Sequence, residues 1–222
     1  MDTNVRFRDL TVDQFISLLG SAQPVPGGGS AAAVAGSLGG ALVAMVASLS
    51  AGRPKFAEHE ELLTEAKATG EALADRLLAL ADEDAAAFAG SGAATKLPRD
   101  TDEERAARAK ALQAAARGAT EAPFRTVQAC LQVALAAESI AGRSNKNASS
   151  DLEVAGLMAV AAARAAAANV FINLPAMGDD ATAQDMLERT EAMVDDIERL
   201  SSQIREIVRG GETRPPLGAG AA

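Results

Sequence analysis

Residues 30–51 read SAAAVAGSLGGALVAMVASLSA and contain no charged side chain. A helix of this length is long enough to span a bilayer. Most of its positions, however, are Ala, Ser or Gly, and Gly36 and Gly40 have the four-residue spacing that lets helix backbones approach closely. A helix that is apolar all round in a soluble protein is surrounded by other helices. We interpret the stretch as a buried core helix whose surroundings include a second subunit, because the other predicted helices are polar and acidic.

The composition indicates an all-α fold. The chain of 222 residues contains 53 Ala, only six Phe, and neither Tyr nor Trp. Ala is the strongest helix former, whereas strands favour β-branched and aromatic residues. A single Cys and a single His exclude a disulfide framework and a zinc finger. The predicted architecture is a multi-helix bundle with a central Ala/Gly-rich buried helix.

The charge balance limits the possible partners. Twenty-one Lys and Arg against thirty Asp and Glu give a formal net charge of −9. This charge disfavours nucleic acids and anionic membrane surfaces, so an anionic ligand needs a local basic pocket. The first residues lack a basic-then-apolar signal peptide, and one unpaired Cys suits a reducing compartment. We therefore expect a cytoplasmic protein with no nucleic-acid or membrane partner.

Capping residues and helix breakers divide the chain. Thr11 with Gln14 and Thr101 with Glu104 form predicted capping boxes, and Pro123 is expected to kink or restart its helix. Glycines at 90 and 92 are expected to loosen the third helix. The predicted organisation is one domain over residues 1–209 and a disordered tail over 210–222, with helices over residues 11–20, 30–51, 55–89, 101–140, 152–174 and 182–208.

Several common catalytic motifs are missing from the sequence. The glycine-rich turn at 27–30 lacks the Lys of a phosphate-binding loop and the preceding strand of a dinucleotide-binding motif. The single histidine, His59, lies among glutamates and is predicted to be on the surface. Cys130 has apolar neighbours and is predicted to be a small core residue. The groups that remain for catalysis or binding are carboxylates, amides, hydroxyls, lysines and the backbone.

Three polar clusters could carry chemistry. Residues 24–30 place free backbone N–H groups at a helix start, which suits an anion or an electron-rich carbonyl edge, although the residues alone favour a turn that needs glycine for its dihedral angles. Asn145, Asn147, Ser150 and Asp151 precede an apolar helix, where Asp151 is either a helix cap or a desolvated general base. A third cluster, four residues apart on one helix face, is expected to bond to a neighbouring helix; it consists of Asn169 and Asn173.

These clusters together resemble the formiminotetrahydrofolate cyclodeaminase and methenyltetrahydrofolate cyclohydrolase family. The resemblance covers about residues 10–209 in the same order. It differs at Ser144, where the family often has Gly, and at residues 53–56, where Pro54 replaces part of a basic motif. The matching motifs are PVPGGGS at 24–30, DAAAF at 84–88, LPRDTDEE at 97–104, NKNASSD at 145–151 and NVFIN at 169–173.

The resemblance implies an all-α homodimer that binds a reduced folate, with or without a polyglutamate tail, and needs no metal. It implies Asp151 as the leading base or proton relay and Asp84 as a second carboxylate. It also implies two groups of residues for the pterin edge or the one-carbon unit: Gly27, Gly28, Gly29 and Ser30, and Asn145, Asn147 and Ser150. A third group, for the glutamate tail, consists of Arg53, Lys55 and Lys96.

The implied activity is the hydrolysis of 5,10-methenyltetrahydrofolate to 10-formyltetrahydrofolate. The first alternative is a cyclodeaminase that releases ammonia from formiminotetrahydrofolate. The second is a non-catalytic folate-binding helical protein, and a helical membrane protein is a distant third. We favour the hydrolase because no formiminotransferase domain is fused to this chain and because LPRDTDEE at 97–104 leans the same way.

Overall fold

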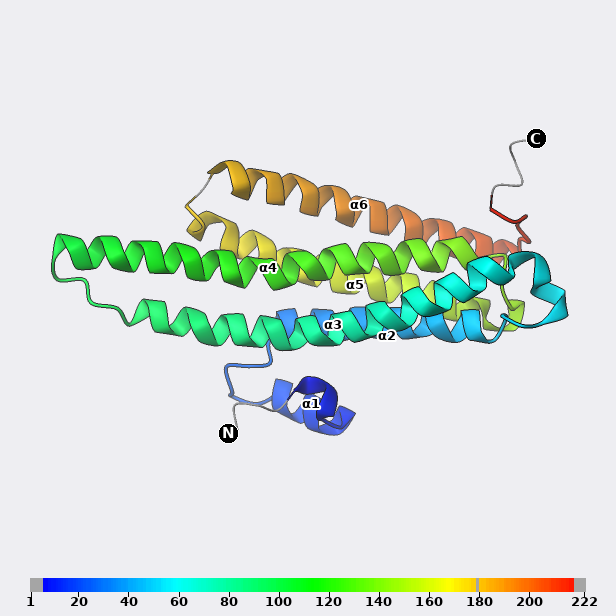
Figure 1. Cartoon of the computed structure of the whole chain (residues 1–222), viewed down its shortest axis with the longest axis horizontal. Coiled ribbons are helices and arrows are strands. Elements are labelled where there is room, and N and C mark those ends of the chain that lie inside the picture. Colours follow the sequence, from blue (N-terminus) through cyan, green and yellow to red (C-terminus); the bar gives the residue numbers. More distant parts are fainter. Residues whose placement is uncertain (1–5, 179, 218–222) are drawn as a thin grey trace.

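The fold is all-α, as predicted (Figure 1). The computed structural model describes residues 6–178 and 180–217. Short 3-10 helices lie at Phe7–Asp9, Pro54–His59, Lys146–Ala148 and Leu174–Ala176. The six α-helices are α1 Val12–Leu19, α2 Gly28–Ser48, α3 Glu60–Thr95, α4 Asp102–Ile140, α5 Ser149–Asn173 and α6 Asp180–Gly210.

Helices α2 to α6 form an elongated bundle in which successive helices run in opposite directions (Figure 1). Helix α2 packs against α3, α4 and α5. Its backbone approaches α3 closely where Gly40 faces Gly70, because a Cβ on Gly70 would lie 2.7 Å from the backbone nitrogen of Ala44. Small residues therefore let these two helices touch through their backbones, as the sequence pattern predicted.

The two most apolar helices are core helices of the bundle. A membrane-length apolar window in α2 is 61% buried, and one in the segment that contains α5 is 44% buried. The core around them is aliphatic and includes the fully buried side chains of Val43, Leu77 and Leu152. The interpretation of residues 30–51 as a buried core helix is confirmed.

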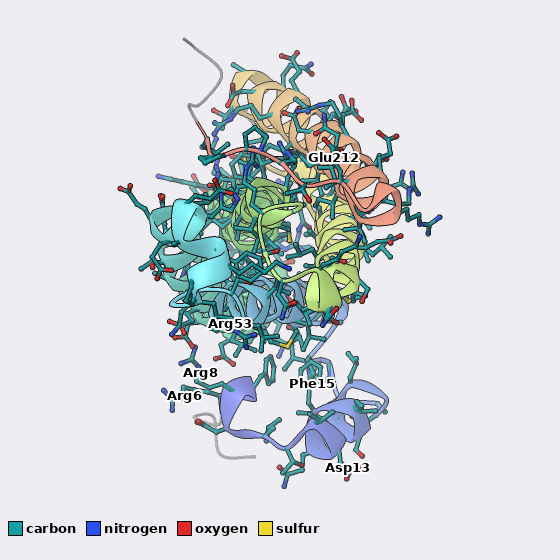
Figure 2. The ribbon with its side chains drawn as sticks, turned by 90° about the vertical axis from the view of Figure 1, so that its right-hand side faces the viewer. Arg6, Arg8, Asp13, Phe15, Arg53 and Glu212 are labelled. Carbon is teal, nitrogen blue, oxygen red and sulfur yellow. The ribbon has the colours of Figure 1, made fainter. Side chains whose placement is uncertain are left out.

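Helix α1 stands beside the bundle, below α2 in Figures 1 and 2. The predicted capping box between Thr11 and Gln14 is present. The segment before it is tied to α3, because the backbone N–H of Phe7 donates to Asp82 at 2.7 Å. The apolar face of α1 stays largely uncovered, with Val12 77% exposed.

Helix α3 ends later than predicted, and α4 is continuous where a kink or restart was predicted. Helix α3 continues past the glycines at 90 and 92 to Thr95, because glycine in a helix interior costs only about 1 kcal/mol. Helix α4 begins at the predicted capping box of Thr101 and Glu104 and runs through Pro123 without interruption. The predicted restart at Pro123 is therefore wrong.

The chain after α6 lies against the loop that follows α4. Arg143 donates to the carbonyl of Pro215 at 2.6 Å, and Arg214 forms an ion pair with Glu138 at 2.7 Å. Residues 218–222 of the predicted tail lie outside the described residues. The division of the chain at residue 209 stays a prediction.

Candidate active site

A cavity of about 400 Å³ lies at the N-terminus of α2. Its volume falls in the usual range of small-molecule sites, about 300–1,000 Å³. The lining combines free backbone groups, one carboxylate, two amides and apolar side chains. It consists of Pro24, Val25, Gly27, Gly28, Gly29, Asp84, Phe88, Ala119, Asn169, Ile172 and Asn173.

Glycines build one wall of this cavity. Helix α2 begins at Gly28, and its cap residue Gly27 has no side chain with which to cap it. The first N–H groups of a helix have no partner within the helix, and the helix dipole favours negative charge there. Gly27, Gly28 and Gly29 of the predicted set therefore line the cavity with their backbone, whereas the N–H of Ser30 donates to Asp84.

Asp84 places a carboxylate over this helix start. The hydroxyl of Ser30 donates to its Oδ2 at 3.0 Å. Burial raises the pKa of Asp84, and hydrogen bonds from the side chain and backbone of Ser30 oppose that rise. A Cβ at position 29 would overlap the carboxylate, so Gly29 is required where Asp84 sits. The structure thus brings together Gly27, Gly28, Gly29, Ser30 and Asp84 from the predicted site.

Asn169 and Asn173 form the opposite wall on α5. Asn169 donates its amide to the carbonyl of Ala165 at 2.8 Å, and Asn173 donates to the carbonyl of Ala119 at 3.2 Å. The carbonyl of Ala119 needs this donor because Pro123, four residues later, has no N–H. The expected structural role of Asn173 is confirmed. No hydrogen bond to either amide oxygen occurs among the described residues, so both oxygens can accept from a ligand.

This explanation predicts a coupling between Asn173 and Pro123. Asn173→Ala should lower the free energy of unfolding by about 1 kcal/mol, because the carbonyl of Ala119 loses its donor. In a Pro123→Ala background the new N–H can bond to that carbonyl, and Asn173→Ala should then cost much less. Urea unfolding of the four proteins measures the coupling. Equal costs in both backgrounds would contradict the assignment.

The other predicted polar cluster lies at the far end of α2. The backbone N–H of Asn145 donates to the hydroxyl of Ser50 at 2.8 Å. Since α2 has 21 residues, this end is about 30 Å from Gly28. Asn145 accepts from the backbone of Asn147, and both Asn147 and Ser150 are exposed.

Asp151 lies in the first turn of α5, half-buried. It does not cap α5, because the cap position is Ala148. Among the described residues its carboxylate has no hydrogen-bond or ion-pair partner. Within one chain, Asp151 therefore does not share the cavity with Asp84.

The predicted tail-binding cations also lie away from this cavity. Arg53 and Lys55 follow the C-terminal end of α2, and Arg53 is labelled at that end of the bundle in Figure 2. Lys96 is twelve residues beyond Asp84 on α3, or about 18 Å along the helix. None of the three lines the cavity at Gly28.

The predictions for the single cysteine and the single histidine differ in their outcome. Cys130 is fully buried, as predicted, and burial raises the pKa of its thiol to about 12. The prediction of a surface His59 is wrong, because its side chain is 3% exposed. Residues 54–59 form a 3-10 helix rather than the start of the α-helix, which changes the direction of this side chain.

Nothing in the described part of the chain groups three His, Cys, Asp or Glu side chains as a metal site would require. The expectation that no metal is needed stays a prediction. The candidate site is a carboxylate opposite two amides, beside the N-terminus of an uncharged helix.

Comparison with known proteins identifies the family. The family model for formiminotransferase-cyclodeaminase matches residues 11–192. The chain belongs to the formiminotransferase-cyclodeaminase family. It is therefore an enzyme of folate one-carbon metabolism, either a cyclohydrolase or a cyclodeaminase.

Three relatives of this family member differ in length and in described activity. A methenyltetrahydrofolate cyclohydrolase from Methylorubrum extorquens is 38% identical over 90% of this chain and 96% of its own length. A formimidoyltransferase-cyclodeaminase from Mus musculus is 36% identical, but the match covers only 32% of that protein. The crystal structure of formiminotetrahydrofolate cyclodeaminase from Thermotoga maritima superposes with a TM-score of 0.82 at 26% identity, covering 91% of this chain and 98% of that one.

The sequence-based set of site residues omitted several residues of the cavity wall. Asn169 and Asn173 carried a signal, since two amides four residues apart on an Ala-rich helix need partners. Phe88 and Ile172 carried no signal beyond their place in the motifs at 84–88 and 169–173, because an apolar side chain on a helix face is usually a core residue. In the structure Phe88 is 58% exposed and Ile172 is 77% exposed at the cavity.

Proposed function

We propose that the enzyme hydrolyses 5,10-methenyltetrahydrofolate to 10-formyltetrahydrofolate. The cavity at Gly28 supports this activity, because it places one half-buried carboxylate beside the N–H groups of the helix start. The cyclohydrolase from Methylorubrum extorquens supports it too, since the match covers 96% of that protein. We further propose that the enzyme acts in the cytoplasm, with a reduced folate as its substrate and with no metal or other cofactor.

The substrate requires little from the protein. Its one-carbon unit is a cationic bridge between N5 and N10, so the carbon is already electrophilic. Water adds to this carbon and loses a proton, giving a tetrahedral carbinolamine. The hydroxyl proton of the carbinolamine is then relayed to N5 as the bond from the carbon to N5 breaks, which leaves the formyl group on N10. A positioned base contributes about 10²–10⁴-fold to such a step.

Asp84 is the leading candidate for the base in this cavity. An ionised Asp84 can accept the proton of the attacking water and also stabilise the cationic substrate. Ser30 holds the carboxylate in place through the hydrogen bond at 3.0 Å. The free N–H groups of Gly28 and Gly29 and the amide oxygens of Asn169 and Asn173 are candidates for orienting the pterin.

The second candidate activity is the cyclodeaminase reaction. The structural match to the cyclodeaminase from Thermotoga maritima favours it. In that reaction N10 attacks the N5-formimino carbon and ammonia leaves, so the same carboxylate could move the protons. Assaying purified protein with both folates separates the two. Loss of methenyltetrahydrofolate absorbance supports the hydrolase, and ammonia release from formiminotetrahydrofolate without hydrolysis would replace it.

Ser30→Ala should shift the pH dependence of the reaction. The hydroxyl of Ser30 stabilises the ionised carboxylate, so its removal should raise the pKa of Asp84 further. Because the base acts when ionised, the acid limb of kcat/KM should move to higher pH. Activity at the alkaline plateau should change little. A pH–rate profile tests this, and an unmoved acid limb would remove Asp84 from that titration.

We propose that the enzyme is a homodimer. Exposed apolar side chains follow one face of each of two neighbouring helices, which no described part of the chain covers. A two-fold interface uses the same surface on both subunits, so an uncharged helix can pair with its own copy. The exposed residues of these faces include Leu38 and Met45 on α2, Leu49 directly after it, and Val154 and Leu157 on α5.

The homodimer would also bring the motif at 145–151 close to the motifs at 27–30 and 84–88. In an antiparallel pairing of α2 with its copy, the N-terminus of one α2 lies beside the C-terminus of the other. The partner's loop at 145–151 would then approach the cavity that contains Asp84. We propose that Asp151 and the amides of that loop act on the folate bound at the other subunit's Asp84. The two ends, about 30 Å apart within one chain, would form one shared site.

A further inference from the structure

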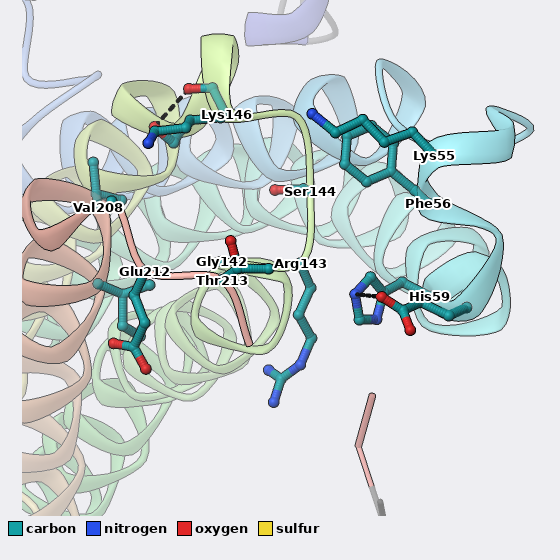
Figure 3. Close-up of a pocket in the computed structure, with 14 residues that line it drawn as sticks. Lys55, Phe56, His59, Gly142, Arg143, Ser144, Lys146, Val208, Glu212 and Thr213 are labelled. Atoms are coloured by element: carbon teal, nitrogen blue, oxygen red, sulfur yellow. Dashed lines mark hydrogen bonds and ion pairs between the residues drawn. The ribbon is translucent and has the colours of Figure 1, made fainter. Parts of the chain in front are cut away.

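A second cavity of about 140 Å³ lies at the opposite end of the bundle from Asp84 (Figure 3). The 3-10 helix at 54–59 forms one wall, and the loop after α4 together with the end of α6 forms the other. Its volume equals roughly five water molecules at about 30 Å³ each. It is too small for a folate and suits a compact ligand.

The charges around this cavity are locally positive in an otherwise acidic chain. Lys55, Arg143 and Lys146 line it against two carboxylates, Glu58 and Glu212. Arg143 is occupied, because it donates to the carbonyls of Ser139 and Pro215. The ammonium groups of the two lysines have no ion-pair partner among the described residues. Two exposed ammonium groups from different segments are therefore available to one anion.

His59 adds a buried polar group to the same cavity. Its side chain is 3% exposed, and its Nε2 lies 3.4 Å from Glu58. Its Nδ1 is buried and has no hydrogen-bond partner among the described residues. Buried polar atoms are nearly always paired, so an unpaired one beside a cavity indicates that a partner is missing.

The remaining lining is apolar and favours a ligand with an aliphatic part. The ring of Phe56 lies 5.5 Å from the ammonium of Lys55, and Val208 faces the cavity from the end of α6. Figure 3 shows Lys55 and Phe56 on one side and Lys146 and Val208 on the other. Glycine at 211 leaves room for the lysine, since a Cβ there would lie 3.0 Å from Nζ of Lys146.

We propose that this cavity binds an aliphatic carboxylate of the size of a glutamate side chain. Lys55 and Lys146 hold the carboxylate from opposite walls, and the apolar side chains receive the methylene groups. Nε2 of His59 faces Glu58, so the unpaired Nδ1 is an acceptor for an N–H group of the ligand. The ligand has two possible sources: a free small carboxylic acid, or the γ-glutamyl tail of a folate whose pterin lies in another subunit. Only the second source rests on the proposed function.

Calorimetric titration tests the site without any turnover. The probes are glutarate, L-glutamate and a γ-linked triglutamate. The test variant is Lys55→Gln with Lys146→Gln, and the matched control is Lys67→Gln with Lys110→Gln, which removes the same charge from exposed positions on α3 and α4. We expect at least one probe to bind the wild type and the control, and to lose at least about tenfold in affinity in the test variant.

The results of the titration distinguish the two sources of the ligand and show whether the proposed site exists. Binding of glutarate or L-glutamate supports a site for a free acid, whereas binding of the triglutamate alone supports a site for the folate tail. No binding of any probe to the wild type would overturn the proposal, and so would equal affinity in the test and control variants. Because the titration measures binding and not turnover, its result does not depend on whether the enzyme is a hydrolase. A failure to bind the probes likewise leaves the proposed reaction untouched.

Discussion

Asp84→Asn is expected to lower kcat/KM for methenyltetrahydrofolate by at least about 10²-fold while the protein stays folded. The amide has nearly the shape of the carboxylate and can still accept the hydrogen bond of Ser30 at 3.0 Å. It cannot take a proton from water or stabilise a cationic substrate. Losing a general base costs about 10²–10⁴-fold, so the effect should exceed that of any other single change in the cavity. Steady-state kinetics and circular dichroism measure the two parts of the prediction.

Two further variants show whether this loss belongs to the carboxylate at its site. Asp75→Asn changes a carboxylate on the same helix whose side chain is 77% exposed, and it should keep wild-type activity. Gly29→Ala leaves Asp84 in the sequence but puts a methyl group where its carboxylate lies, so activity should fall strongly. An Asp84→Asn protein with wild-type kcat/KM would remove this residue from the mechanism.

The parts of the fold that depend on local sequence could be predicted. The capping boxes at Thr11 and Thr101 use residues three positions apart, and both are present. The small residues of residues 30–51 indicated a buried helix, and Gly40 packs backbone to backbone against α3. The prediction failed where tertiary partners decide the outcome. Pro123 stays inside α4 because a side chain 50 residues later bonds to the carbonyl that the proline leaves free.

The position of His59 shows the same limit. Three neighbouring glutamates indicated a solvated helix face, but the 3-10 turn after Pro54 buries the imidazole at the base of a cavity. A pattern of charges predicts exposure only if the expected helix forms through it. The change from an α-helix to a 3-10 helix rotates each following side chain by about 20° per residue.

The sequence predicted the polar clusters of the candidate site but not which of them lie together in the fold. Residues 27–30 and Asp84 meet because α3 returns antiparallel along α2, a topology that no local pattern encodes. The same up-and-down order separates Asp84 from Asp151, since α5 starts at the opposite end of α2. Motif order along the chain therefore does not decide whether the two carboxylates serve one site, and their roles require a test that links subunits.

That test is the activity of dimers built from two different chains. If each site takes Asp84 from one subunit and Asp151 from the other, homodimers of Asp84→Asn and of Asp151→Asn should both be nearly inactive. A heterodimer of these two chains holds one site with both changes and one site with neither. It should therefore recover about half of the wild-type kcat per dimer. Co-expression with two affinity tags and purification on both gives the heterodimer without the homodimers.

A second heterodimer makes the result decisive. It pairs a wild-type chain with a chain that carries both Asp84→Asn and Asp151→Asn. With shared sites, every site now contains one changed carboxylate, so this heterodimer should be nearly inactive. With sites inside single chains, the wild-type chain keeps half of the activity and the first heterodimer has almost none. The two arrangements thus predict opposite results from the same four carboxylates, and a chain that stays monomeric in solution would contradict sharing outright.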